Sequence, residues 1–409
     1  MTKSSPMRAP EKDIFIPAKK ACYVGVAGKA RKVKKIYTGV DNKARKVKKA
    51  YVGVGGKARP FFSAEQKLTY YGTVTPLSVA RGALAATTVG NYGLFGGGGY
   101  YTSYFSAVVD AYSPTLVRST PTALRVRRHS AAATTVGNYG LFGGGYESLG
   151  GGDDSQSTEV DAYSASLVRS NPTGLIIESA NLAATTVGNF ALFGGGYALD
   201  GAQKYVSAYS ATLVRSAPTE LSQAKEGLAA ASVGNFALFG GGYLFGGYLN
   251  SVDAYSTSLV RSTPTPMSKV RYLSAATSVG NFALFGGGET DLAQGTGSTD
   301  TVDAYSAALV RSTPTALGAR RSSLAATTVG NYGLFGGGLY PGGVADQNAV
   351  DAYSATLVRS TPTRLSQRRY DLAATTAGNY GLFGGGHYYD PDDNPAHSST
   401  VDAYTVEGG

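Results

Sequence analysis

Short apolar and polar segments recur along most of the chain at a nearly fixed interval. The motif V-G-N-[YF]-[GA]-L-F-G-G-G, with alanine for the valine in one copy, occurs seven times, with its asparagine at positions 91, 138, 189, 235, 281, 331 and 379. The tyrosine of a second motif, V-D-A-Y-S, follows at positions 112, 163, 209, 255, 305, 353 and 404. A third motif, L-V-R-S-x-P-T, follows six of the seven copies. A period of 46 to 51 residues indicates a repeat architecture in which each unit packs on the next.

The residue pattern within each unit predicts four short strands. In the first unit, residues 84–89 end at Gly90-Asn91, a pair that favours a tight turn, and the chain returns through residues 92–95. A variable loop, a third strand at 109–112, a short turn at 113–115 and a fourth strand that starts at 116–118 complete an antiparallel meander. Four strands per unit are typical of a propeller blade, and the Ala/Thr-rich first strand suits the crowded axis. We therefore predict an all-β fold, a seven-bladed β-propeller of four-stranded antiparallel blades over residues 63–409.

The two ends of the repeat region complement each other. The seventh unit stops at residues 401–405, after its third strand, and residues 68–77 have the place of a fourth strand that lacks its own first three. We predict that this N-terminal strand forms the outer edge of the last blade and closes the ring.

Composition narrows the class of protein. Glycine is 56 of 409 residues without a strict Gly-X-Y period, which excludes collagen, and 16% charged residues argue against wholesale disorder. We expect no signal peptide, transmembrane segment or membrane insertion, because no apolar stretch has the required length. A single cysteine, Cys22, and three histidines leave few options for a metal, so no metal or other cofactor is expected.

Positive charge is concentrated in an N-terminal arm, residues 1–62. The arm holds 17 basic and three acidic residues, a net charge of +14, whereas residues 63–409 hold 20 basic and 24 acidic residues, a net charge of −4. Such asymmetry predicts an acidic partner for the arm.

The repeats resemble the kelch family of propellers over residues 68–404. In that family a basic residue precedes the first strand, a double glycine ends the second, and a tyrosine follows in the third, as here. The departure is the fourth strand, where kelch repeats usually carry tryptophan. This chain has none, and leucine stands near that point at positions 116, 167, 213, 259, 309 and 357.

The sequence offers no sign of catalysis. Galactose-oxidase-like propellers need a copper centre with two Tyr, two His and a cysteine crosslinked to one Tyr, whereas here the only cysteine lies in the arm and the histidines are confined to unit 2 and the unit 7 loop. The Ser-x-Asp-x-Gly repeats of sialidase-like propellers are absent. No P-loop, G-x-S-x-G or H-E-x-x-H motif occurs. We therefore expect that the protein is not an enzyme.

Basic residues precede the first strand in six units. In one interpretation they ring the mouth of the axial channel and bind an anion or an acidic glycan; in the other, each one hydrogen-bonds neighbouring carbonyls, as the kelch arginine is expected to. These residues are Arg81, Arg128, Lys225, Arg271, Arg321 and Arg369, with Ser179 in unit 3.

Third-strand aspartates and fourth-strand arginines form a second candidate group. A hairpin centred on residue 114 would place Asp110 opposite Arg118, a cross-strand pair worth about 0.2 to 1 kcal/mol, which we interpret as structural. The same pairing is predicted for Asp161 with Arg169, Asp253 with Arg261, Asp303 with Arg311 and Asp351 with Arg359, and unit 3 keeps Arg215 without its acid.

The loops between second and third strands are the most variable part of the repeat. In a meander they leave from the same face as the links between blades, so they could form a recognition surface, although neutral drift would also make them dissimilar. The candidate contact residues are Tyr100, Tyr101, Tyr104, Tyr146, Tyr197, Tyr243, Tyr340 and Tyr388.

The arm has its own period of 14 residues. Two-residue turns at 27–28, 41–42 and 55–56 predict three β-hairpins with basic second strands, too small to bury a core alone. The phrase K-K-x-Y-x-G-V-x-x-K-A-R-K-V resembles tandem repeats in virion structural proteins of phages and prophages of Gram-positive bacteria. The predicted docking residues are Tyr23, Tyr37, Tyr51, Lys34, Lys35, Lys48 and Lys49.

Three functions compete. The first is a noncatalytic virion protein whose arm docks onto an acidic tail or capsid protein and whose propeller loops bind a host-surface glycan or protein. The second is a nucleic-acid-binding arm on a propeller that serves as a protein-interaction scaffold. The third, a glycan-active propeller enzyme, is the least favoured.

Overall fold

The computed structural model describes residues 66–407 except 101–103, 149–153, 292–296, 341–346, 391 and 393, together with six strands between residues 23 and 63. The chain divides into two compact units, residues 1–67 with 407–409 and residues 68–406. The division falls slightly later than the predicted boundary at 62/63, because β6 (Lys57–Ser63) belongs to the last hairpin of the arm. The described part of the chain contains no helix that could cross a membrane.

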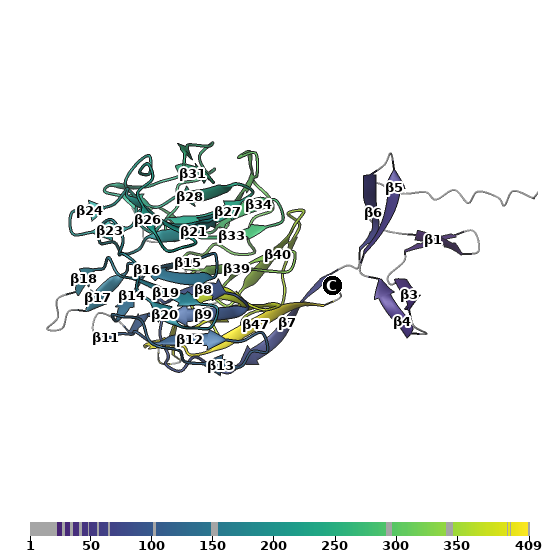
Figure 1. The fold of residues 1–409 in the computed structure, drawn as a ribbon, viewed down its shortest axis with the longest axis horizontal. Helices are drawn as coiled ribbons and strands as arrows, with labels where there is room; N and C mark the ends of the chain where they lie inside the picture. Colours follow the sequence, from purple (N-terminus) through teal and green to yellow (C-terminus); the bar gives the residue numbers. More distant parts are fainter. Residues whose placement is uncertain are drawn as a thin grey trace, which may run out of the picture. The chain divides into compact units, whose positions relative to one another are not determined.

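Seven four-stranded sheets form the second unit, and each is one blade of a β-propeller (Figure 1). The innermost strands of blades 1 to 7 are β8 (Ala85–Val89), β15 (Ala132–Val136), β21 (Ala183–Val187), β27 (Ala229–Val233), β33 (Ala275–Val279), β39 (Ala325–Val329) and β43 (Ala373–Ala377). The second strands are β9 (Tyr92–Gly96), β16 (Tyr139–Gly143), β22 (Phe190–Gly194), β28 (Phe236–Gly240), β34 (Phe282–Gly286), β40 (Tyr332–Gly336) and β44 (Tyr380–Gly384).

The outer half of each blade is built from two further strands. The third strands are β12 (Val109–Tyr112), β19 (Val160–Ser164), β25 (Val206–Ser210), β31 (Val252–Ser256), β37 (Val302–Ser306), β41 (Val350–Ser354) and β47 (Val401–Glu407). The outer strands are β13 (Arg118–Ser119), β20 (Arg169–Ser170), β26 (Arg215–Ser216), β32 (Arg261–Ser262), β38 (Arg311–Ser312), β42 (Arg359–Ser360) and, in blade 7, β7 (Lys67–Val74).

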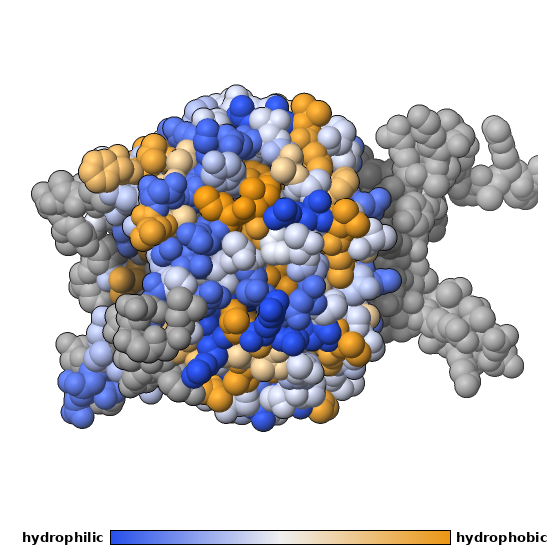
Figure 2. Space-filling model, turned by 60° about the vertical axis from the view of Figure 1, so that its left-hand side comes forward, coloured by the Kyte–Doolittle hydropathy of each residue, from blue (hydrophilic) through white to orange (hydrophobic). Residues whose placement is uncertain are grey.

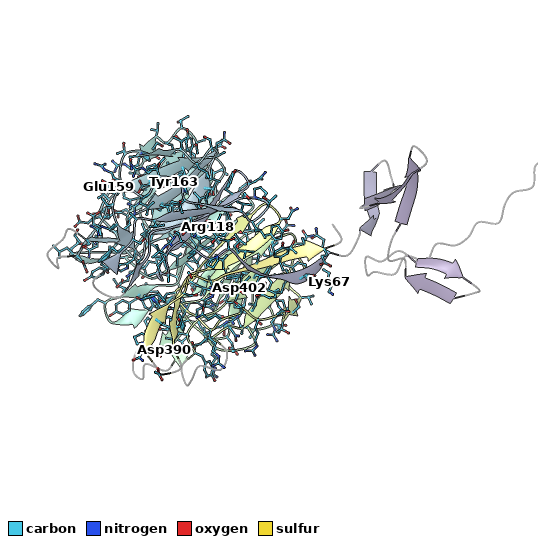
Figure 3. The ribbon with its side chains drawn as sticks, turned by 90° about the horizontal axis from the view of Figure 1, so that it is seen from below. Lys67, Arg118, Glu159, Tyr163, Asp390 and Asp402 are labelled. Carbon is cyan, nitrogen blue, oxygen red and sulfur yellow. The ribbon has the colours of Figure 1, made fainter. Side chains whose placement is uncertain are left out.

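Strand β7 completes blade 7, as the sequence predicts. It pairs with β47, and the two lie side by side in Figure 1, β7 in purple-blue and β47 in yellow. Tyr70 donates its hydroxyl hydrogen to Oδ1 of Asp402 at 2.7 Å, and its ring centroid lies 5.2 Å from that of Tyr404. Further along the chain, the Leu77 N–H donates to the Ser399 carbonyl at 2.7 Å. The partner number falls from 402 to 399 as the chain advances from Tyr70 to Leu77, so the two segments run in opposite directions. Figure 3 shows Asp402 within the blade and Lys67 where β7 begins.

The glycine triplet that ends each second strand allows close packing between blades. A Cβ on Gly96 would lie 2.7 Å from the ring of Phe142 in the next blade, and one on Gly97 would lie 2.6 Å from the Arg128 carbonyl. The Gly98 N–H donates to that carbonyl at 2.9 Å. The positive φ angles of Gly97 and Gly98 favour glycine as well.

These contacts recur around the molecule and close it into a ring. Phe95 of blade 1 packs on Gly384 of blade 7, and the Gly386 N–H donates to the Arg81 carbonyl at 2.9 Å. Each of the seven core clusters combines side chains of two neighbouring blades, including blades 7 and 1. The last blade therefore meets the first through the same interface as every other pair.

The third-strand tyrosines join neighbouring blades as well. Tyr163, which is fully buried, packs edge-on against Phe142 with ring centroids 5.9 Å apart. Its hydroxyl donates to the Thr122 carbonyl at 2.7 Å, which belongs to the Pro-Thr pair that follows the outer strand of blade 1. The equivalent bond forms from all seven tyrosines. This bond ties the third strand of each blade to the segment that follows the outer strand of its neighbour.

The axis of the ring is a channel lined by small side chains. Thr135 Oγ1 donates to the Thr88 carbonyl of the preceding blade at 2.5 Å, and Ser278 Oγ donates to the Ser232 carbonyl at 2.6 Å. A cavity of about 340 Å³ lies within this collar of threonine, serine and alanine. The small side chains predicted for the first strand thus line an open, hydroxyl-rich channel.

Short hairpins follow the second strands on the face that also carries the links between blades. The first strand of each hairpin forms a β-bridge with a residue three positions before an innermost strand. One example is the bridge between Glu226, which precedes β27, and Tyr243. The hairpin strands are β10 (Gly99–Tyr100), β11 (Tyr104–Phe105), β17 (Tyr146–Ser148), β18 (Asp154–Gln156), β23 (Tyr197–Ala198), β24 (Gly201–Ala202), β29 (Tyr243–Leu244), β30 (Gly247–Tyr248), β35 (Glu289–Asp291), β36 (Gly297–Ser298), β45 (His387–Tyr389) and β46 (Pro395–His397), and β14 (Arg128–His129) pairs with β17.

The arm contains the three predicted antiparallel hairpins. They pair β1 (Tyr23–Val26) with β2 (Lys29–Lys32), β3 (Ile36–Val40) with β4 (Lys43–Val47), and β5 (Lys49–Val54) with β6. Of the predicted docking residues, Tyr23, Tyr37, Tyr51 and Lys49 lie in these strands, and Lys34, Lys35 and Lys48 lie outside the described residues.

Replacing Tyr70 by phenylalanine should destabilise the propeller. The buried Asp402 carboxylate loses a hydroxyl donor, so the free energy of unfolding should fall by about 1.5 to 3 kcal/mol, as measured by chemical denaturation of the full chain. Tyr71→Phe is the matched control, because Tyr71 is 55% exposed and phenylalanine keeps its ring contact with Tyr380. Equal effects of the two substitutions would contradict the closing role of β7.

Candidate functional site at the mouth of the axial channel

The six basic residues that precede the innermost strands are buried inside their blades. Arg81, for example, is 1% exposed, and its guanidinium donates to the Gly97 carbonyl from Nε at 2.7 Å. The predicted anion-binding ring is therefore wrong for these residues, because each is paired with the buried third-strand aspartate of its own blade. The pairs are Arg81–Asp110 (2.8 Å), Arg128–Asp161 (2.6 Å), Lys225–Asp253 (2.9 Å), Arg321–Asp351 (2.5 Å), Arg271–Asp303 and Arg369–Asp402.

The same carboxylates also interact with two further segments. Oδ1 of Asp110 accepts the Ser78 N–H at 3.0 Å, in the link that leads into the blade. The predicted pairs with fourth-strand arginines also form, at 3.6 Å for Arg118–Asp110, 3.3 Å for Arg169–Asp161, 3.1 Å for Arg261–Asp253, 2.9 Å for Arg311–Asp303 and 2.6 Å for Arg359–Asp351.

The register of these pairs differs from the prediction. Arg118 stands opposite Tyr112, so its side chain reaches Asp110 diagonally, along the same face of the sheet. The hairpin is centred on residue 115 instead of residue 114, and within it Leu116 adopts a left-handed backbone conformation with φ of 63°. Leucine recurs at this position with a positive φ in all six hairpins.

Burial and the partner charge act in opposite directions on the pKa values of Arg81 and Asp253. Burial lowers the pKa of the Arg81 guanidinium, and the charge of Asp110 acts in the opposite direction. In blade 4, burial acts to raise the pKa of Asp253, but Lys225 and the Ser222 hydrogen bonds outweigh it and hold that pKa below its ordinary value. At both residues the partner therefore opposes the effect of burial on the charged form.

Blade 3 lacks both members of the pair. Ser179 replaces the basic residue and donates to the Gly195 carbonyl at 2.8 Å, and Ser207 replaces the aspartate and accepts the Ile176 N–H at 3.0 Å. An unpartnered buried charge is strongly destabilising, so the two charges are absent together. Arg215, whose carboxylate partner is missing, donates instead to the Gly174 carbonyl at 2.8 Å.

Blade 2 can be converted to the serine pair of blade 3 as a test. Arg128→Ser and Asp161→Ser should each lower the free energy of unfolding by about 3 to 5 kcal/mol, because each leaves a fully buried charge without its buried partner. The double variant should cost at least about 2 kcal/mol less than the sum of the two single changes, as measured by a denaturation double-mutant cycle. Additive losses would show that the two side chains do not act as a pair.

Seven backbone hydrogen bonds close a ring at the mouth of the channel. Each ring residue stands two positions after the basic residue of its blade, or after Ser179 in blade 3, and has a positive φ. Its N–H donates to the carbonyl of the ring residue in the preceding blade. The bond that joins blades 1 and 7, from the Ala83 N–H to the Asp371 carbonyl, is 2.9 Å long. The ring residues are Ala83, Ser130, Asn181, Gly227, Leu273, Ser323 and Asp371.

A pocket of about 230 Å³ opens at this ring. It is lined by the seven ring residues and by their C-terminal neighbours, of which five are leucines. Asp371 carries the only charged side chain among these lining residues. Burial raises the pKa of the Asp371 carboxyl to about 6, although a hydrogen bond from Ser323 opposes the shift.

Two glutamates and a tyrosine cluster stand at the rim of this mouth. Glu226 accepts a hydrogen bond from Asn181 Nδ2 at 3.3 Å, and Glu289 accepts one from Tyr248 at 2.9 Å. The ring of Tyr272 covers Gly227, where a Cβ would lie 2.0 Å from its Cε2 atom, and stacks on Tyr248 with centroids 5.5 Å apart. Burial raises the pKa of Glu226. The rim therefore combines aromatic surface with carboxylates.

The three histidines lie at the rim in blades 2 and 7. Phe105 stacks on His129 at 4.7 Å, and the Nδ1 atoms of His387 and His397 lie 2.6 Å apart. Burial lowers the pKa of all three histidines, in His387 to about 4, so they are neutral at neutral pH. Within the described residues, no group of three or more His, Cys, Asp or Glu side chains could hold a metal.

Most of the predicted loop tyrosines lie on this face. Tyr146, Tyr197, Tyr243, Tyr340 and Tyr388 are half-buried, and Tyr146 and Tyr243 contact the rim residues His129 and Tyr272. Tyr100 and Tyr104 lie in strands β10 and β11, and Tyr101 is outside the described residues. More exposed still are Leu199 (86%) and Phe245 (97%), at the hairpin tips of blades 3 and 4. Figure 2 shows hydrophobic and hydrophilic residues intermixed on the side that it presents, without one continuous apolar area.

The sequence prediction placed a site at the mouth of the channel but missed the residues that line it. A sequence signal for these residues exists in the two positions after each basic residue or Ser179. The residue type at these positions differs between units, whereas the flanking motifs are nearly the same in every unit. The first of these positions holds Gly82, His129, Ala180, Glu226, Tyr272, Ser322 and Tyr370.

Comparisons with known proteins identify the fold but no family. No protein-family model and no curated protein matches the sequence. Among solved structures, that of YjhT is similar, with a TM-score of 0.56 and 12% sequence identity, over 71% of this chain and 99% of that chain. At this identity the similarity shows the propeller fold alone.

Proposed function

We propose that this protein is a noncatalytic virion protein of a phage or prophage, with a kelch-like propeller that binds a host-surface glycan at the mouth of its channel. In this proposal the N-terminal arm docks onto an acidic tail or capsid protein. The observation that carries the glycan assignment is the mouth, a small pocket whose rim combines Tyr272 with Glu226 and Glu289.

The chemistry of a sugar suits these groups. Sugar hydroxyls donate hydrogen bonds to carboxylates and carbonyls, and the C–H face of a pyranose packs on an aromatic ring. A pocket of about 230 Å³ is small for a drug-sized molecule and suits one sugar or the end of a chain. The half-buried tyrosines of the surrounding hairpins would contact further units of the glycan.

The arm supports the docking half of the proposal. Its net charge of +14 favours an acidic partner, and its three separate hairpins are too short to be stable without one. The tandem-repeat resemblance supports a phage particle as the place where that partner is found.

A glycan-active enzyme remains the second candidate because of Asp371. A carboxyl group whose pKa is raised to about 6 in a pocket is the kind of group that acts as a general acid. Catalytic release of sugar by the full chain, abolished by Asp371→Asn, would favour this candidate over noncatalytic binding.

The full chain should bind glycans on an array of host-surface sugars. Tyr272→Ala should weaken binding at least about tenfold, and Tyr272→Phe should retain it, because the ring provides the packing surface. Val260→Ala, an exposed change in the hairpin between β31 and β32, is the control. Absence of glycan binding, together with salt-sensitive binding of DNA or RNA by the full chain, would overturn the proposal in favour of the nucleic-acid alternative.

A further inference from the structure

The polar groups at the mouth are mostly hydrogen-bond acceptors. The ring consumes the N–H groups of all seven of its residues, whereas each ring carbonyl accepts one bond there and keeps a second lone pair. Asn181 donates its side-chain amide to Glu226. A ligand at this mouth therefore meets the carbonyl oxygens of the ring and the rim carboxylates, whereas the N–H groups of the ring residues are already used.

The charge at the mouth is negative. Asp371 lies in the lining, Glu226 bonds to the ring residue Asn181, and Glu289 accepts a bond from Ser322, which precedes the ring residue Ser323. The basic residues of the neighbouring frame cannot offset these carboxylates, because six of them are buried and paired inside the blades. The rim histidines are neutral at neutral pH.

We infer that the mouth selects a sugar that presents hydrogen-bond donors and carries no negative charge, with Asp371, Glu226 and Glu289 as its specificity-determining residues. This inference rests on the proposed glycan-binding function and narrows its ligand class. A neutral sugar satisfies the acceptors through its hydroxyls, and an amine-bearing sugar does so with an added attraction to the carboxylates. A carboxylated sugar is repelled by the three carboxylates and finds no cation to pair with in the lining.

Glucose, glucosamine and glucuronate test the inference, since they differ mainly in one substituent. Binding to the full chain is measured by ligand-observed NMR titration in buffer at neutral pH, where the Asp371 carboxyl, whose pKa is about 6, is mostly ionised and most of the glucosamine amine is protonated. Glucosamine should bind at least as tightly as glucose, and glucuronate at least tenfold more weakly than either. Asp371→Asn should lower the ratio of the glucuronate to the glucosamine dissociation constant at least threefold. Asp154→Asn, at an exposed hairpin position, should leave this ratio unchanged.

The outcomes separate this inference from the proposed function. Glucuronate binding as tight as that of glucose would overturn the inference while leaving glycan recognition in place. The inference would also be overturned if glycan binding on the array were the same in the wild-type chain and in the variants Asp371→Asn, Glu226→Gln and Glu289→Gln, because the ligand would then bind elsewhere. Loss of all array binding in the wild-type chain would instead overturn the proposed function.

Discussion

The channel, its mouth and the loop face depend on one constraint, which is that each blade obtains hydrogen-bond partners from the next blade and the seventh obtains them from the first. Glycine N–H groups, tyrosine hydroxyls and ring amides all find their acceptors across a blade interface. A buried polar group without a partner costs about 1 to 3 kcal/mol, so an open ring would leave several such groups unsatisfied at one junction. Strand β7 belongs to the same constraint, because it supplies blade 7 with the edge and the donor to Asp402 that a hairpin supplies elsewhere.

The constant residues of the repeat serve this frame, and the variable residues are left for recognition. The basic residues show the division most clearly, since they are paired inside the blades and leave the mouth with the carboxylates of Asp371, Glu226 and Glu289. The ring likewise consumes its own N–H donors and keeps acceptors available. The repeated residues therefore determine which charges and hydrogen-bonding groups remain available at the mouth, although the side chains that distinguish the site come from the variable positions.

Because the sequence is periodic, much of the fold could be predicted from it. Much less of the candidate site could be predicted in this way. The seven blades, the closing strand and the three arm hairpins follow from spacing and turn residues, because each signal is local or repeated. The burial of Arg81 does not follow from local pattern alone, since its partner stands 29 residues away and only the fold brings the two together. The diagonal position of Arg118 depends on a left-handed leucine that no propensity favours. Glu226, Glu289 and Asp371 come from different units and have no common motif, so their meeting required the structure.

Hydrogen exchange at the seven ring amides tests the closed ring most directly. The account predicts that the N–H groups of residues 83, 130, 181, 227, 273, 323 and 371 exchange with similar, strong protection, because all seven bonds break only when the ring opens as a whole. Protection of Ala83, at the junction of blades 1 and 7, should equal that of Gly227 on the opposite side of the ring. Rapid exchange confined to Ala83 would show that the first and last blades are not joined, and would contradict the account.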